Sequence, residues 1–162
     1  MIKSLFPSIA DNQYRGRWTA LAFFIPALFV KAAIGWNMAG LNPYFAPADI
    51  LRDIDGIPLD AFAPEASEAI LFFAMAWGFA TVLIGMVGVL ALVRYRALLP
   101  FSILLLLMEQ GGRQAFDKVT ALTGSESTTT AEASWINTGL TGFLLVAFIL
   151  SIIPKRSTLQ NQ

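Results

Sequence analysis

Residues 104–118, LLLLMEQGGRQAFDK, decide how many times this chain is expected to cross a membrane. The stretch begins as a hydrocarbon-soluble helix and then places Glu109 and Arg113 one helical turn apart. Its apolar run, residues 98–108, is 11 residues long, which makes about 16 Å of helix against a hydrocarbon core of about 30 Å. If the helix ended there, it would have to return to the side of the membrane from which it entered. The basic residues before it and those near the C-terminus would then lie on opposite sides of the membrane. We therefore predict that the helix continues to about Asp117, with its polar half shielded by other helices or facing a watery cavity.

Composition independently indicates a membrane protein. Hydrophobic residues make up 56% of the 162 residues and charged residues only 14%, more apolar surface than one soluble core of this size could bury. The formal net charge is zero, so nucleic acid is not an expected partner. Cysteine and histidine are both absent, which excludes disulfides, His- or Cys-ligated haem and the usual zinc and copper sites. No metal or cofactor is expected.

Four segments are long and apolar enough, or nearly so, to span a bilayer. The predicted fold is an all-α integral membrane protein, a single domain over residues 1–162 folded as a four-transmembrane-helix antiparallel bundle. A long acidic outer loop joins helices 1 and 2. The first seventeen residues contain no small-residue cleavage site, so the mature chain is expected to start near Met1. The predicted spans are residues 18–38, 68–93, 98–117 and 134–153.

The loop charges predict the orientation. An even number of spans puts both termini on one side, and outside the spans seven basic residues fall on the termini and the turn between spans two and three, against two on the other side. By the positive-inside rule, both termini are expected in the cytoplasm. The expected location is a bacterial inner membrane. The seven are Lys3, Arg15, Arg17, Arg94, Arg96, Lys155 and Arg156; the two are Arg52 and Lys118.

The outer loops have little regular structure in this interpretation. Between spans one and two, residues 47–54 have the spacing of a short surface helix but could equally form an irregular cap over the bundle, and the cap is favoured. The second outer loop, residues 120–134, is rich in Ser and Thr and is expected to be mobile.

Small residues form stripes on two of the spans. Such stripes let helices approach closely in lipid. We interpret them mainly as packing faces within the chain, with a homo-oligomer contact as the alternative. In span four the stripe is Ser134, Thr138 and Gly142. In span two it is Ala74, Gly78, Thr81, Gly85 and Gly88.

Charged residues inside the spans mark the candidate site. Lys31 and Glu109 lie at matching depth, about 10–12 Å inside the outer ends of spans one and three. Arg113 lies one turn from Glu109 on the same face, a spacing that allows an ion pair between them. Trp77, Phe72 and Phe73 are interpreted as core or lipid contacts. The predicted ligand-binding residues are Lys31, Glu109, Arg113, Gln110, Asn137 and Glu68, with Gln114 as a further polar neighbour.

Two interpretations of this cluster remain open. In the first, Glu109 bridges Lys31 and Arg113 as a purely structural staple. In the second, the two cations leave one positive charge beyond Glu109, facing an outward-opening cavity that binds a lipid-like or small anionic molecule, or docks on a larger membrane complex. The second describes a small non-catalytic protein. Catalysis is not expected, because no nucleophile, metal set or phosphate loop accompanies Glu109. An oligomeric proton-coupled transporter using Glu109 is the alternative from another class.

Part of the chain resembles the DoxX-like membrane proteins, which are compact four-helix chains. The likeness rests on Lys31 late in span one, the loop phrase GIPLDAF at residues 56–62, Glu68 opening span two, and VLIG ending in Gly85. This resemblance implies an accessory subunit associated with membrane redox or stress functions, although the chain has no cysteine for thiol chemistry of its own.

Overall fold

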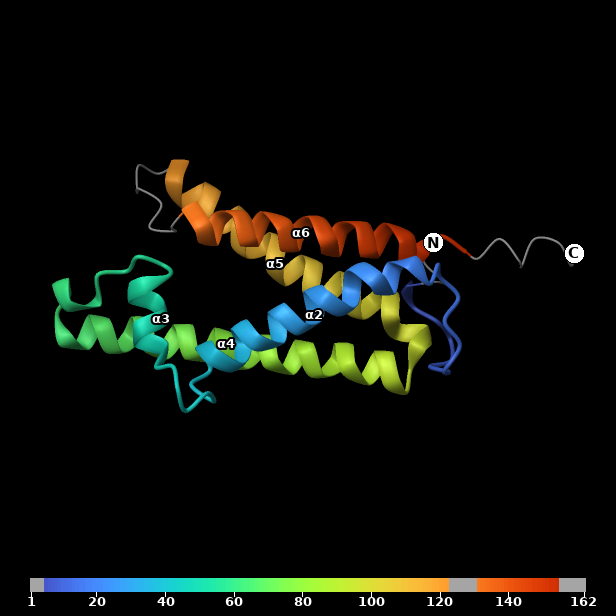
Figure 1. The fold of residues 1–162 in the computed structure, drawn as a ribbon, viewed down its shortest axis with the longest axis horizontal. Helices are drawn as coiled ribbons and strands as arrows, with labels where there is room; N and C mark the ends of the chain where they lie inside the picture. The colour runs from blue at the N-terminus through green and yellow to red at the C-terminus, as the bar shows by residue number, and fades with distance from the viewer. Residues whose placement is uncertain (1–4, 123–130, 155–162) are drawn as a thin grey trace, which may run out of the picture.

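The computed structural model describes residues 5–122 and 131–154, and within these ranges the chain is helical, without a strand (Figure 1). The long helices are α2 (Thr19–Met38), α4 (Pro64–Val93), α5 (Leu99–Leu122) and α6 (Ala131–Ile152). The short α3 (Pro47–Asp53) and two 3-10 turns, Leu59–Ala61 and Arg96–Leu98, lie between them. Three of the long helices, α2, α4 and α6, are long and apolar enough to cross a membrane, as a multi-pass membrane protein requires. The part of the second outer loop at 123–130 lies outside the described residues.

Helix α5 confirms that the polar stretch is helical. It runs from Leu99 through Glu109 and Arg113 to Leu122 without a break, and the pair Gly111 and Gly112 does not interrupt it. α5 is not one of the three helices with the hydropathy of a span. The half of α5 that follows Met108 is therefore a polar helix packed among apolar ones.

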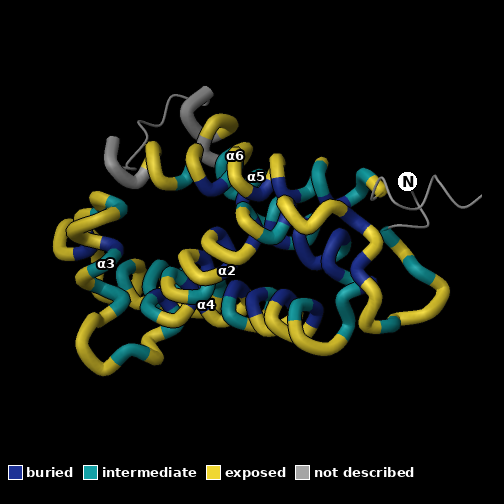
Figure 2. Tube along the Cα trace, turned by 45° about the vertical axis from the view of Figure 1, so that its right-hand side comes forward, coloured by how far each residue is buried: buried dark blue, intermediate teal, exposed yellow. Residues whose placement is uncertain are grey.

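The four long helices pack around one another with alternating direction (Figure 1). α2 contacts both α4 and α6, while α5 contacts α6 and α4. Buried apolar side chains from all four helices form the main core, among them Phe24, Ala91, Ile103 and Leu144. In Figure 2 the buried positions lie where helices face one another, and the outward positions are exposed.

The outward surface of α4 is apolar. Within the most apolar 18-residue stretch of α4, only 17% of the residues are buried inside the fold. Large apolar side chains are exposed along the helix, including Phe72, Phe73, Phe79 and Met86. A helix that is hydrophobic all round needs an apolar environment on every side. This face therefore has the character of a lipid-exposed surface.

Gly78, Thr81 and Gly88 of the stripe on span two lie against α2, whereas an added Cβ at Gly85 would meet nothing within 4 Å; Ala74 packs at the second core cluster. Gly78, Thr81, Gly85 and Gly88 are buried. A Cβ added to Gly78 would lie 2.5 Å from the backbone nitrogen of Ala39, closer than any real contact allows. The backbones of α2 and α4 meet here because no side chain separates them.

The predicted stripe on span four is on the wrong face. Ser134, Thr138 and Gly142 are exposed, so they do not form a packing face within the chain. Leu140 and Leu144 are buried instead, two positions from the predicted stripe and hence about 200° around the helix. α6 packs through larger apolar side chains.

A short helix and an apolar cluster cover the end of α2. The chain leaves α2 through Gly40, whose φ is +71°, while the N–H groups of Gly40 and Leu41 bond to the carbonyls of Asn37 and Trp36. This is a Schellman ending, which needs the left-handed conformation that glycine adopts easily. The favoured irregular cap is wrong, because α3 is a helix. Its Leu51 packs with Met38 and Leu59 in a second core cluster.

The segment before α2 closes the opposite end of the fold. Gly16 pairs with Pro154 in an isolated bridge, and a Cβ at Gly16 would overlap the carbonyl oxygen of Ser151. Tyr14 is buried here and donates a hydrogen bond to the carbonyl oxygen of Arg17 at 3.0 Å. Burial raises the pKa of Tyr14 to about 12.

Candidate functional site

A buried ion pair joins α2 to α5. Lys31 is completely buried, and its Nζ lies 2.5 Å from Oε2 of Glu109. The same ammonium group donates a hydrogen bond to Oε1 of Gln110 at 3.0 Å. Lys31 and Glu109, which were predicted to lie at matching depth, are thus in direct contact. Two acceptors on α5 hold the lysine, as a buried charge requires.

Trp77 of α4 is the centre of the cluster. Its indole Nε1 donates a hydrogen bond to the second carboxylate oxygen of Glu109 at 2.9 Å. Both cations lie over its ring, Lys31 Nζ at 5.7 Å and the Arg113 guanidinium carbon at 4.9 Å from the centroid. Trp77 also packs against the second core cluster, so the interpretation of it as a core contact is confirmed, but that interpretation did not include these polar partners. Its position on α4 gave no sign of polar partners, since they lie on other helices.

Asn137 of α6 completes the set, so that all four long helices contribute. Arg113 Nη2 donates a hydrogen bond to Oδ1 of Asn137, and Nε2 of Gln110 donates to the same oxygen at 3.2 Å. Among the described residues, Glu109 forms its ion pair with Lys31, and the pair with Arg113 that the spacing allows is not formed. Glu109 turns toward α2 and Trp77, while Arg113 turns toward α6.

Two donors in this region are left without an acceptor. Arg113 Nε and Gln114 Nε2 are buried atoms with no hydrogen bond to the described part of the chain. A buried donor without a partner costs about 1–3 kcal/mol. Arg113 therefore has one N–H donor that its bond to Asn137 does not use.

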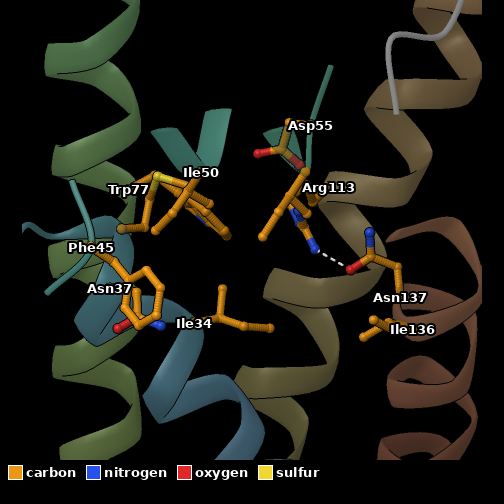
Figure 3. A pocket seen from close by; sticks show the side chains of 11 residues that line it. Ile34, Asn37, Phe45, Ile50, Asp55, Trp77, Arg113, Ile136 and Asn137 are labelled. Atoms are coloured by element: carbon orange, nitrogen blue, oxygen red, sulfur yellow. Dashed lines mark hydrogen bonds between the residues drawn. The ribbon is translucent and has the colours of Figure 1, made fainter. Parts of the chain in front are cut away.

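Arg113 and Asn137 line a cavity of about 310 Å³ between the helices and the loop after α2 (Figure 3). Most of its wall is apolar, contributed by Ile34, Met38, Phe45, Ile50, Ile54, Trp77 and Ile136. Its polar lining residues are Asn37, Asp55, Arg113 and Asn137. An apolar pocket with a few polar groups is the usual form of a small-molecule site.

Asp55 is a site residue that sequence reasoning missed. Figure 3 shows it beside Arg113, across the cavity from Trp77. It follows α3 and precedes Gly56, whose φ of +69° turns the chain. The charged side chains described at the site and cavity are two cations, Lys31 and Arg113, and two carboxylates, Glu109 and Asp55. The single excess positive charge that the sequence predicted is therefore balanced by Asp55. The glycine after the aspartate was the available signal, but it could not show which way the loop folds.

Glu68 does not belong to the cluster. It is exposed and lies nine residues before Trp77 on α4, about 13 Å along the helix axis. Of the predicted residues, the structure brings together Lys31, Glu109, Gln110, Arg113 and Asn137.

No protein-family model, curated protein or solved structure matches this chain significantly. The resemblance to DoxX-like proteins stays a prediction, and function has to be argued from the site itself.

Proposed function

We propose that this protein is a small, non-catalytic protein of a bacterial inner membrane that binds a lipid-like molecule in the cavity lined by Trp77 and Arg113. The observation that supports the proposal most is the pairing of an apolar wall with the Arg113 guanidinium, whose Nε is buried without an acceptor. Apolar walls suit an acyl chain or glycerol backbone, and the guanidinium suits an oxygen-rich headgroup.

The depth of the cavity favours a lipid. Its lining residues on α2 are Ile34, Asn37 and Met38, which lie within the last five positions of that helix, about 6 Å from its end. Since the 20 residues of α2 match the thickness of a hydrocarbon core of about 30 Å, the cavity would lie where lipid headgroups meet acyl chains. A lipid could reach it without leaving the membrane.

The proposal includes a topology with four spans and both termini in the cytoplasm. α5 would be the fourth span, its polar half shielded from lipid by α4 and α6, which it contacts. The basic residues Arg94 and Arg96 at the turn before α5 support this orientation. The cavity would then open toward the periplasmic side. A role as accessory subunit of a larger complex is compatible with this topology and with the exposed face of α6.

Lipid retention through Arg113 tests the proposal. The full-length protein is purified in a gentle detergent, and bound lipid is measured by native mass spectrometry for wild type, Arg113→Gln and Lys118→Gln. Lys118 is the matched control, a cation on the same helix that is exposed. We expect Arg113→Gln to lose bound lipid by about tenfold, the effect of one charged hydrogen bond, and the control to retain it. Equal lipid retention by all three proteins would contradict the proposal.

The second candidate function is a proton-coupled transporter, which the buried carboxylate of Glu109 favours. Protonation of Glu109 would break its ion pair with Lys31 and could drive a rearrangement. Glu109→Gln in reconstituted vesicles distinguishes the candidates. Loss of a proton-linked flux that wild type supports, with folding intact, would establish transport, whereas lipid binding alone predicts no flux in either protein.

A further inference from the structure

The described residues that line the cavity include one cation and one carboxylate. Arg113 and Asp55 both line it, and Asn37 and Asn137 are its neutral polar lining residues. A simple anion entering this space would gain from Arg113 but would also approach the carboxylate of Asp55, so the attraction would be partly cancelled. The charge composition thus narrows the class of ligand.

The Arg113 side of the cavity suits a phosphate. Its Nη2 is already bonded to Asn137, whereas its Nε is buried without an acceptor. A guanidinium binds phosphate oxygens through several N–H groups arranged as a planar fork. The guanidinium carbon of Arg113 also lies 4.9 Å from the centroid of the Trp77 ring, a cation–π contact that helps to hold the side chain at the cavity wall.

The Asp55 side suits a cation. A carboxylate is the natural partner of an ammonium group, and Asp55 is the carboxylate among the described residues that line the cavity. Asp55 and Arg113 lie beside each other (Figure 3), which is the arrangement that a ligand with adjacent opposite charges requires.

Size limits how much of the ligand is held. A cavity of about 310 Å³ is at the lower end of the range for ligand pockets, about 300–1,000 Å³. A headgroup and part of the glycerol fit in it, while two acyl chains would have to remain in the bilayer beside the exposed apolar faces.

We propose that the cavity selects a zwitterionic phospholipid headgroup, with the phosphate on Arg113 and Asn137 and the ammonium on Asp55. This inference rests on the proposed function and specifies its ligand class. It predicts discrimination between lipids that differ only in the headgroup.

A competition experiment tests it. The full-length protein is incubated with equal amounts of phosphatidylethanolamine and phosphatidylglycerol bearing identical acyl chains, and the two adducts are measured by native mass spectrometry. Wild type should retain the zwitterionic lipid by about tenfold over the anionic one, the effect of one charged contact. Asp55→Asn should bring the ratio to one or below while lipid is still bound. The matched control Asp53→Asn, an exposed residue of α3 outside the cavity lining, should keep the wild-type ratio.

The outcomes separate the two proposals. Equal or greater retention of phosphatidylglycerol by wild type, or identical ratios for Asp55→Asn and Asp53→Asn, would overturn the zwitterion inference and leave lipid binding intact. Lipid retention that Arg113→Gln does not reduce would overturn the proposed function itself. If Arg113→Gln fails to fold, Arg113→Lys serves in its place, because it keeps the charge but not the fork and should weaken both lipids. Soluble glycerophosphoethanolamine, added in excess, distinguishes a site for the free ester, where it displaces the lipid, from one that needs the acyl chains.

Discussion

The Lys31–Glu109 pair offers the sharpest test of how this fold is held together. The perturbation is a double-mutant cycle made of Lys31→Met, Glu109→Gln and the two combined. Lys31 is fully buried and the Glu109 side chain is 14% exposed, so each single change leaves the opposite charge, or its hydrogen bonds, without compensation. Glu109→Gln leaves the ammonium with Gln110 as a neutral acceptor, and Lys31→Met leaves the carboxylate with the Trp77 N–H.

The contacts give the expected size of the effect. Removing one partner of a buried pair costs about 3–5 kcal/mol, and the remaining neutral partners bring each single variant to about 3 kcal/mol, the low end of that range. Independent sites would add to about 6 kcal/mol. Removing both charges leaves no unpaired ion, so the double variant should lose only about 3 kcal/mol or less, which gives a coupling of at least about 3 kcal/mol.

Reversible unfolding in mixed micelles, followed by circular dichroism, measures the four free energies of unfolding. The control is the exposed pair of Arg52 with Asp49 on α3, for which the same kind of cycle should give a coupling below about 1 kcal/mol. Additive losses at Lys31 and Glu109, with a coupling no larger than that of the control pair, would refute the argument that a desolvated ion pair fastens α2 to α5.

Three further predictions concern other parts of the fold. Gly78→Ala should lower the free energy of unfolding because its Cβ would overlap the backbone of α2, whereas Gly142→Ala, with nothing within 4 Å of its Cβ, should keep it or raise it by up to about 1 kcal/mol, the helix preference of Ala over Gly; a loss equal to that of Gly78→Ala in the unfolding assay would contradict the close packing. Because burial raises the pKa of Tyr14 from 10.0 to about 12, its neutral form stabilises the fold fully below pH 10, and this stability is lost as the pH rises from 10 to 12; Tyr14→Phe should remove both the late step in tyrosinate absorbance and that loss. Since the chain has no cysteine, Tyr44→Cys should react with a membrane-impermeant maleimide on intact spheroplasts and Ser8→Cys only after lysis, and the reverse pattern would invert the proposed topology.

Hydropathy and charge predicted the elements well because both depend on position along the chain. Spans predicted at 18–38 and 68–93 correspond to α2 and α4, and the helical continuation of α5 followed from the length that a span needs. The depth of Lys31 and Glu109 could also be predicted, since 1.5 Å per residue fixes how far each lies from its helix end. A contact between two opposite charges at equal depth was then expected, because an unpaired charge in an apolar bundle has a high free energy.

Helix rotation and loop path were harder to predict, because they depend on partners distant in sequence. A stripe through Ser134 and Thr138 is as regular as the buried one through Leu140 and Leu144, and only the fit against α2 and α5 decides between them. Spacing allowed Glu109 to pair with Arg113, but a tryptophan from α4 and an asparagine from α6 offered each of them another partner. Asp55 reaches the cavity through the fold of the loop after α3, which no periodic pattern describes.

The two charged pairs differ in what they can do. Lys31 and Glu109 satisfy each other and are held further by Gln110 and Trp77, so a ligand competing for either would have to break a desolvated contact. Arg113 lines a cavity and has one buried N–H donor without an acceptor in the described part of the chain. The double variant of Lys31 and Glu109 should therefore change stability more than lipid selectivity, and Asp55→Asn should do the opposite. In the proposed function, a structural ion pair and a ligand site would lie on one face of α5, one turn apart, and each would account for one of the two charges that the sequence places there.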